Sequence, residues 1–457
     1  MNPAREPSRI DVTRWDETQS AEGVFRSIVA GGLPLFLSMI AASVGSAIVV
    51  AILGDYDTAA LAAFNLTGSV YTPASVALSG CLRAAVPFIA PYRENPRVAV
   101  PIIRDSYWFG VVIGTMGAFP VTLVPLVGSL FGASPEILNE LGSLPLLMAL
   151  NLLVITVGGA RTSVLIAYGK NRQVLWVAVT STASAMLLTP LLVSGAGFLP
   201  GLGISGAGVA LVVSSTASAV QANIHLRNVP VLSGASLWPG RPRPHKIKEL
   251  ARVGVPSSAT LLVKAFALGL ASLGVARIGA SAGAVHAVLS SINGFLMVAS
   301  LATAQAAVPI LARAAAAGDL ALCRRIARTS LLVGVSVAGA GACVLLAAKP
   351  WIIGVFTPDP AVRGEVGSLL GLMILSALPE GAKAASGRSL LALKEARVSL
   401  VNFAVGYSLL ALSIFPVRDH FGLAGIWWSI AAVNVYLAIK QTIDFRRTSR
   451  VKIQAPA

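Results

Sequence analysis

Long apolar runs follow one another along the whole chain, separated by short clusters of Gly, Pro and charged residues. Most runs hold about 20 residues or more, which is the length a helix needs to cross a bilayer. A large soluble core would require helices with charged outer faces, and these runs lack them. The pattern predicts an all-α polytopic membrane protein with twelve transmembrane helices, near 27–53, 60–90, 106–130, 142–168, 174–199, 205–226, 253–276, 282–312, 326–350, 366–392, 398–417 and 422–443.

The two halves of the chain repeat the same pattern. GGLPLFLS at 31–38 and VGVPSSAT at 253–260 both open a span, and RAAVPFIAP at 83–91 matches QAAVPILAR at 305–313 with the same offset. Six spans per half give a parallel repeat, and two such lobes commonly rock about a central cavity. The expected organisation is an N-terminal tail at 1–26, an N-lobe at 27–227, an interlobe linker at 228–251, a C-lobe at 252–445 and a C-terminal tail at 446–457.

The distribution of Lys and Arg along the chain predicts how the protein is oriented in the membrane. The chain is 55% hydrophobic and only 12% charged, with a formal net charge of +16. Most Lys and Arg side chains fall in the loops on the side of both tails, which predicts that both termini are cytoplasmic. The other side holds only Arg277, Lys349, Arg363 and Arg418.

Several classes of protein do not fit the sequence. No basic stripe carries interleaved aromatic residues, so we expect no nucleic-acid partner. No nucleotide-binding loop, metal-ligand spacing or nucleophile–base pair is present, so we expect neither an enzyme nor a metal site. The expected partners are a small-molecule substrate and the lipid bilayer of a prokaryotic plasma (inner) membrane, with the protein as a monomer.

Motifs in both halves resemble the multidrug and toxic compound extrusion (MATE) family. They are GLPLFLS…GDYDTAALAAF in the first half, and GVPSSA…VARIGASAGAVHAVLSSINGFLMVASLATAQAA, FTPDPAVRGEVGSLL, LALKEARVSLVNFAVGY and FGLAGIWWSIAA in the second. The resemblance covers about residues 27–445 and places the chain in the wider multidrug/oligosaccharidyl-lipid/polysaccharide flippase superfamily. It implies a secondary active exporter that works by antiport of H⁺ or Na⁺, with no cofactor besides that coupling ion.

The resemblance also implies three acidic residues inside the membrane. In register, these positions are Val49 in span 1, Lys264 in span 7 and Glu380 in span 10. One expected acid is therefore kept, one is apolar and one has the opposite charge. These departures bear on the coupling site and on the usual organic-cation substrate.

Charged residues inside spans are expensive, at about 2.5–3.5 kcal/mol each at the centre of a helix. Glu380 and Lys383 share a helix face because residues three apart are neighbours. We expect Lys264, Glu380 and Lys383 to form one cluster that carries the coupling ion or substrate. The alternative is a structural salt bridge that locks the second lobe.

Two arginines inside first-lobe spans, Arg83 and Arg161, predict positive charge in the cavity. Arg suits carboxylate and phosphate groups, so the expected substrate is anionic or zwitterionic. Two other functions remain open: a lipid-linked saccharide flippase, and a transport-inactive scaffold or sensor. Polar residues expected to line the substrate cavity beside the arginines are Gln305, Asn293 and Tyr71.

Overall fold

The computed structural model describes residues 20–195 and 201–454, and within these ranges the chain is helical with no strand. The N-lobe holds α2 (Ala21–Tyr56), α3 (Thr58–Arg83), α4 (Val86–Ile89), η2 (Ala90–Tyr92), α5 (Pro96–Thr122), α6 (Val124–Leu130), α7 (Pro135–Glu140), α8 (Leu144–Ala167), α9 (Asn171–Ser194) and α10 (Gly203–Arg227). The C-lobe holds α11 (Pro244–Ala276), α12 (Ala280–Ala316), α13 (Leu320–Ala347), α14 (Lys349–Phe356), α15 (Pro360–Ala392) and α16 (Ala396–Gln454).

Helix α16 contains two membrane spans. Its 59 residues would extend for about 90 Å as a straight helix, three times the thickness of the hydrocarbon core. Gly422 breaks the helix with φ 59° and ψ −147°, and Asn402 before it donates a 2.8 Å hydrogen bond to Asp444 after it. The two halves therefore run back along each other. With this division, the eleven apolar helices of membrane-spanning length in the described residues supply twelve spans, which confirms the predicted fold class.

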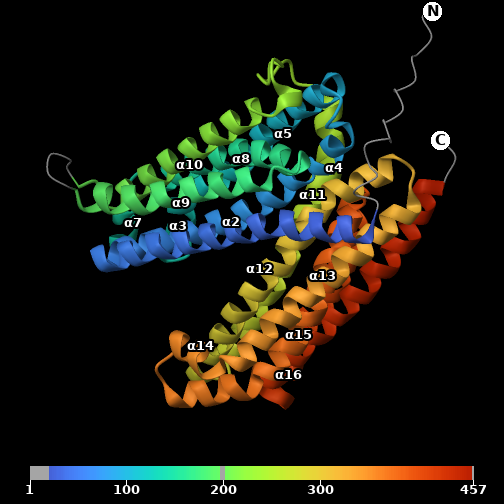
Figure 1. The fold of residues 1–457 in the computed structure, drawn as a ribbon. Helices are drawn as coiled ribbons and strands as arrows, with labels where there is room; N and C mark the ends of the chain where they lie inside the picture. Colours follow the sequence, from blue (N-terminus) through green and yellow to red (C-terminus); the bar gives the residue numbers. More distant parts are fainter. Residues whose placement is uncertain (1–19, 196–200, 455–457) are drawn as a thin grey trace, which may run out of the picture.

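The two lobes form separate bundles that diverge from a shared junction (Figure 1). Small residues let the helices cross closely there. A Cβ on Gly32 of α2 would lie 3.0 Å from Thr303 of α12, and one on Gly80 of α3 would lie 3.1 Å from Ser258 of α11. The Ser258 hydroxyl donates to the Ala77 carbonyl across this crossing. Close backbone approach at small residues is a general device for packing helices in membranes.

Helices extend beyond several of the predicted boundaries. α11 begins at Pro244, inside the predicted linker 228–251, and α16 continues through 446–454 of the predicted C-terminal tail. α2 begins at Ala21, where the Ser20 side chain caps the helix by accepting from the Gly23 amide at 2.9 Å. Residues 1–19 of the predicted N-terminal tail, 196–200 at the end of the predicted fifth span, and 455–457 lie outside the described residues.

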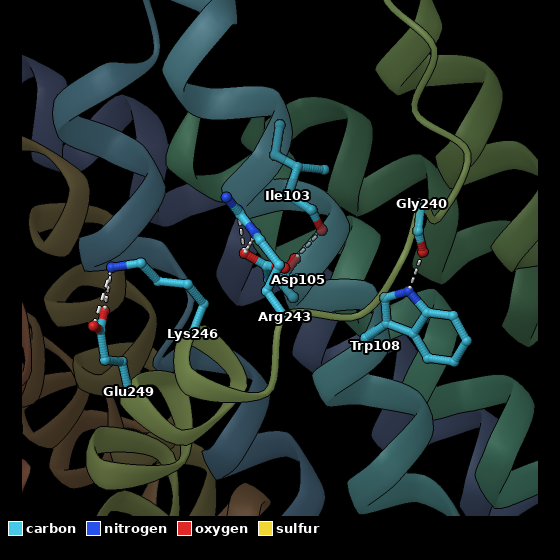
Figure 2. A network of polar contacts seen from close by, with 8 residues as sticks. Ile103, Asp105, Trp108, Gly240, Arg243, Lys246 and Glu249 are labelled. Atoms are coloured by element: carbon cyan, nitrogen blue, oxygen red, sulfur yellow. Dashed lines mark hydrogen bonds and ion pairs between the residues drawn. The ribbon is translucent and has the colours of Figure 1, made fainter. Parts of the chain in front are cut away.

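The interlobe linker is fastened to the N-lobe helix α5 (Figure 2). The Trp108 indole donates to the Gly240 carbonyl at 2.7 Å, and the Arg243 guanidinium forms an ion pair with the buried Asp105 carboxylate. Hydrogen bonds to Asp105 also raise the pKa of Arg243 above its usual value. The linker therefore holds the start of α11, a C-lobe helix, against the N-lobe.

Candidate functional site

Helix α15 carries Glu380 and Lys383, and a close backbone contact fixes its position along α13. A Cβ on Gly381 would lie 2.8 Å from the Gly334 carbonyl oxygen, so these two backbones touch. The Ser300 hydroxyl of α12 donates to the same carbonyl at 3.1 Å. Glu380 is the residue before Gly381, so this backbone contact fixes the position of the Glu380 carboxylate within the C-lobe.

Glu380 lies between two lysines, and one of its oxygens serves both. Oε1 accepts from Lys383 at 3.1 Å and also from Lys264, which comes from α11. The Glu380 and Lys383 side chains are each 4% exposed, and Lys264 is 16% exposed. The structure thus brings together the three residues that we expected to form a cluster, while their transport role stays a prediction.

The two lysines differ in their remaining partners. Lys383 also donates to the side-chain oxygen of Asn434 at 2.8 Å and to the Tyr407 hydroxyl at 3.2 Å. Lys264 has only the Met297 sulfur, at 3.0 Å, as a further partner among the described residues. Sequence reasoning missed Asn434 and Tyr407, because only the packing of α16 against α15 reveals them.

This cluster lines a C-lobe cavity of about 310 Å³. Its charged lining residues are Lys264, Glu380, Lys383 and Arg388, so three cations face one anion. Hydroxyl groups from α11 and α16 add neutral hydrogen-bonding groups, and Val76 of the N-lobe helix α3 closes one wall. The charged groups of the described lining are therefore net positive.

Two adjoining cavities in the N-lobe, of about 590 and 190 Å³, share Arg83. Tyr71 lines the larger one and accepts a 2.9 Å hydrogen bond from Asn151. Gln305 lines the smaller one, and neither polar atom of its buried amide has a partner among the described residues. Val49, where the family resemblance implies an acid, also lines the larger cavity. Neither set of described lining residues contains an Asp or Glu.

Two of the expected cavity residues lie elsewhere. The Arg161 guanidinium sits 5.2 Å from the centre of the Tyr107 ring and donates to the Val157 carbonyl at 3.2 Å. Asn293 on α12 has a buried side-chain oxygen without a partner among the described residues. Neither residue is among those that line the three cavities described above.

Arg388 is a site residue that the sequence analysis missed. It lies inside the predicted tenth span, 366–392, near the end of α15, and is only 9% exposed, but it was not named among the candidate site residues. The sequence signal that could have identified Arg388 is its spacing from Glu380 and Lys383. Glu380, Lys383 and Arg388 follow the i, i+3, i+8 pattern that places residues on one side of a helix.

Two six-span lobes with a charged cavity among apolar helices define a multi-pass membrane transporter. The chain belongs to the MatE family, whose model matches residues 34–191 and 256–417. One match falls in each lobe, in agreement with the internal repeat. Each of the two predicted lobes therefore contains one match to the same family model.

Individual relatives cover nearly the whole chain. The multidrug resistance protein NorM of Burkholderia vietnamiensis is 26% identical over 435 residues, which is 92% of each chain. An outward-facing multidrug resistance MATE family transporter of the MOP superfamily superposes with a TM-score of 0.83 at 16% identity, over 94% of this chain and 96% of its own.

A second solved structure is a MOP superfamily transporter from Pyrococcus furiosus, described by a binding pocket of reverse polarity that suggests a different function. It matches with a TM-score of 0.82 at 16% identity, over 94% of this chain and 96% of its own. At this identity the solved structures support the fold alone, so the polarity of the present cavities rests on this chain's own residues.

Proposed function

We propose that this protein is a secondary active exporter that moves an anionic or zwitterionic organic molecule by cation antiport. The observation that carries the proposal is the Lys264–Glu380–Lys383 cluster on the wall of the C-lobe cavity. Relatives named for multidrug resistance support export as the direction of transport. Positive-inside charge supports a plasma-membrane location with cytoplasmic termini.

The proposed coupling runs through the lysines. Glu380 accepts hydrogen bonds from both ammonium groups, so Lys264 and Lys383 are the proton-bearing groups of the cluster and the candidates to carry the coupling proton. Lys264 is the more suitable carrier, since it is more exposed than Lys383 and has fewer partners. Protonation of Lys264 then alternates with occupation of the cavity by the substrate.

Transport in proteoliposomes tests this proposal. The protein is reconstituted with an imposed pH or Na⁺ gradient, and the flux of labelled carboxylates, phosphates and lipophilic cations is compared. We expect Lys264→Gln and Lys383→Gln to abolish gradient-driven flux of anions, and Lys440→Gln to preserve it. Lys440 is a suitable control because it pairs with Asp444 at a partly exposed position outside the cavity.

Two results would refute the proposal. If both cavity-lysine variants keep gradient-driven flux, the lysines do not couple transport. If lipophilic cations are transported and anions are not, the substrate has the opposite charge from the one proposed.

A further inference from the structure

Two embedded arginines have no partner among the residues that the structure describes. The other cations inside the spans are engaged: Lys264 and Lys383 bind Glu380, and Arg161 stacks on Tyr107. Arg83 and Arg388, in contrast, have neither a hydrogen bond nor an ion pair with any residue in 20–195 or 201–454. Such a pair of unpartnered guanidinium groups calls for an explanation, because a buried charge is costly unless it is paired.

The two arginines flank a buried contact between the lobes. Ala84, which follows Arg83, belongs to a small buried cluster with Val253, Leu391 and Ala396. Leu391 lies three residues after Arg388, so the residue that follows α3 in the N-lobe shares a buried cluster with the end of α15 in the C-lobe. The short helix α4 that comes next packs against α15. Arg83 and Arg388 therefore carry like charges on the two sides of this buried cluster.

Each arginine also faces a cavity. Arg83 lines both N-lobe cavities, and Arg388 lines the C-lobe cavity. The described residues that line the N-lobe cavities include no carboxylate, and in the C-lobe cavity Glu380 is already held by two lysines. No described protein group is therefore available to neutralise this pair.

A ligand can supply the missing charge. An arginine does not give up its proton in a protein, so the pair cannot relieve its repulsion by titrating. Its planar, forked donors match the geometry of carboxylate and phosphate groups. We propose that Arg83 and Arg388 together bind an oxyanion, a carboxylate or phosphate group, at the junction of the two lobes.

This site links binding to the arrangement of the lobes. Arg83 belongs to the N-lobe and Arg388 to the C-lobe, so a bound oxyanion joins the lobes where they are in contact. Without the anion, the like charges of Arg83 and Arg388 favour separation of the two lobes at this cluster. If the protein transports by alternating access, as proposed above, parting of the lobes divides the site and releases the anion.

Anion-dependent thermal stability of the purified protein tests the site without requiring transport. Citrate and inorganic phosphate are titrated at fixed ionic strength, with chloride as the balancing anion. A ligand that binds only the folded protein raises the melting temperature. We expect citrate or phosphate to stabilise the wild type, and Arg83→Gln and Arg388→Gln each to weaken the apparent affinity at least tenfold.

The matched control is Arg161→Gln, which removes an embedded arginine of the N-lobe that has its own aromatic partner. It should keep the anion response. Arg388→Lys keeps the charge without the fork and should show an intermediate affinity. Without anion, Arg388→Gln should melt at or above the wild-type temperature, because it removes an unpaired buried charge; a merely structural arginine would give a lower melting temperature.

Nanodiscs distinguish a soluble anion from a lipid headgroup. If the headgroup occupies the site, phosphatidylglycerol stabilises the wild type and weakens the citrate response, and both effects are lost in Arg388→Gln. The inference is overturned if neither citrate, phosphate nor phosphatidylglycerol stabilises the wild type beyond chloride, or if Arg388→Gln keeps the full response. Anion binding without flux in proteoliposomes would instead leave this site standing and overturn the proposed transport.

Discussion

Removal of the Glu380 carboxylate is the sharpest test of the charge cluster. In Glu380→Gln, both lysines lose the one ionic partner that they have in the described part of the chain, but they are affected to different extents. Lys383 keeps the Asn434 and Tyr407 oxygens, whereas Lys264 keeps only the Met297 sulfur. We therefore expect the unpaired Lys264 ammonium to account for most of the lost stability.

The burial of the three side chains sets the magnitude. Removing one partner of a buried ion pair costs about 3–5 kcal/mol. Glu380 is 4% exposed, and a Gln amide oxygen still accepts a hydrogen bond, so we expect Glu380→Gln to cost about 3 kcal/mol. Glu380→Gln/Lys264→Met removes the stranded charge and should recover about 1–2 kcal/mol of that loss.

Reversible unfolding in mixed micelles measures these differences. Tryptophan fluorescence is followed as the fraction of denaturing detergent rises, for the wild type, both single variants and the double variant. Lys246→Met serves as the control, since it breaks the exposed pair with Glu249, and such a pair is worth about 0–1 kcal/mol. The reasoning is refuted if the double variant is less stable than Glu380→Gln alone.

Three further predictions concern the framework around the site. Glu94→Gln removes a 2.8 Å interlobe ion pair with Arg313, and spin-label distances between the two lobes near this pair should show a shift of up to about fivefold toward separated lobes. Wild-type distances would contradict this. Asp105→Asn should cost about 1–3 kcal/mol and speed tryptic cleavage of the linker, because the buried carboxylate no longer holds the linker on α5; unchanged cleavage would mean that other contacts suffice. Gly381→Ala should cost about 1–3 kcal/mol by pushing α15 off α13, whereas Gly371→Ala on the same helix meets nothing within 4 Å and should be neutral or stabilising. Equal effects of the two alanines would show that the close approach is not what matters.

The fold was predictable because its signals are local and repeated. Membrane-spanning length can be read from each apolar run, and the matching segments at 31–38 and 253–260 reveal the two lobes. Helix ends were less predictable. α11 begins at Pro244, within a basic, proline-rich stretch that looks like linker, because a helix can continue beyond the apolar run that marks the bilayer.

The charged site was predictable only in part. Helix periodicity places Glu380 and Lys383 on one face, and the family resemblance supplied the register that adds Lys264. The further partners Tyr407 and Asn434 come from α16 and depend on tertiary packing. No spacing within the sequence specifies which residues of one helix face another across a lobe.

Arg388 shows how a charge near the end of an apolar run is misread. Near a span end, Arg usually reaches the interface or the loop, and the basic residues that follow it favour that interpretation. Here the end of α15 shares a buried cluster with Ala84 of the other lobe, and Arg388 lies inside the protein on the wall of a cavity. Burial was decided by the junction between lobes and not by the depth of the residue along its own helix.

The cations inside the spans differ in whether they have a protein partner, and this difference indicates a binding role for Arg83 and Arg388. Each embedded cation carries an insertion cost of about 2.5–3.5 kcal/mol at the centre of a span. Where such a charge serves only structure, a protein partner offsets this cost, as Glu380 does for Lys264 and Lys383. Arg83 and Arg388 lack such a partner in the described chain, and they flank a buried contact between the lobes, each on the wall of a cavity. An oxyanion that enters from these cavities would offset the charge of both arginines and hold the lobes together, which no neutral residue at either position could do.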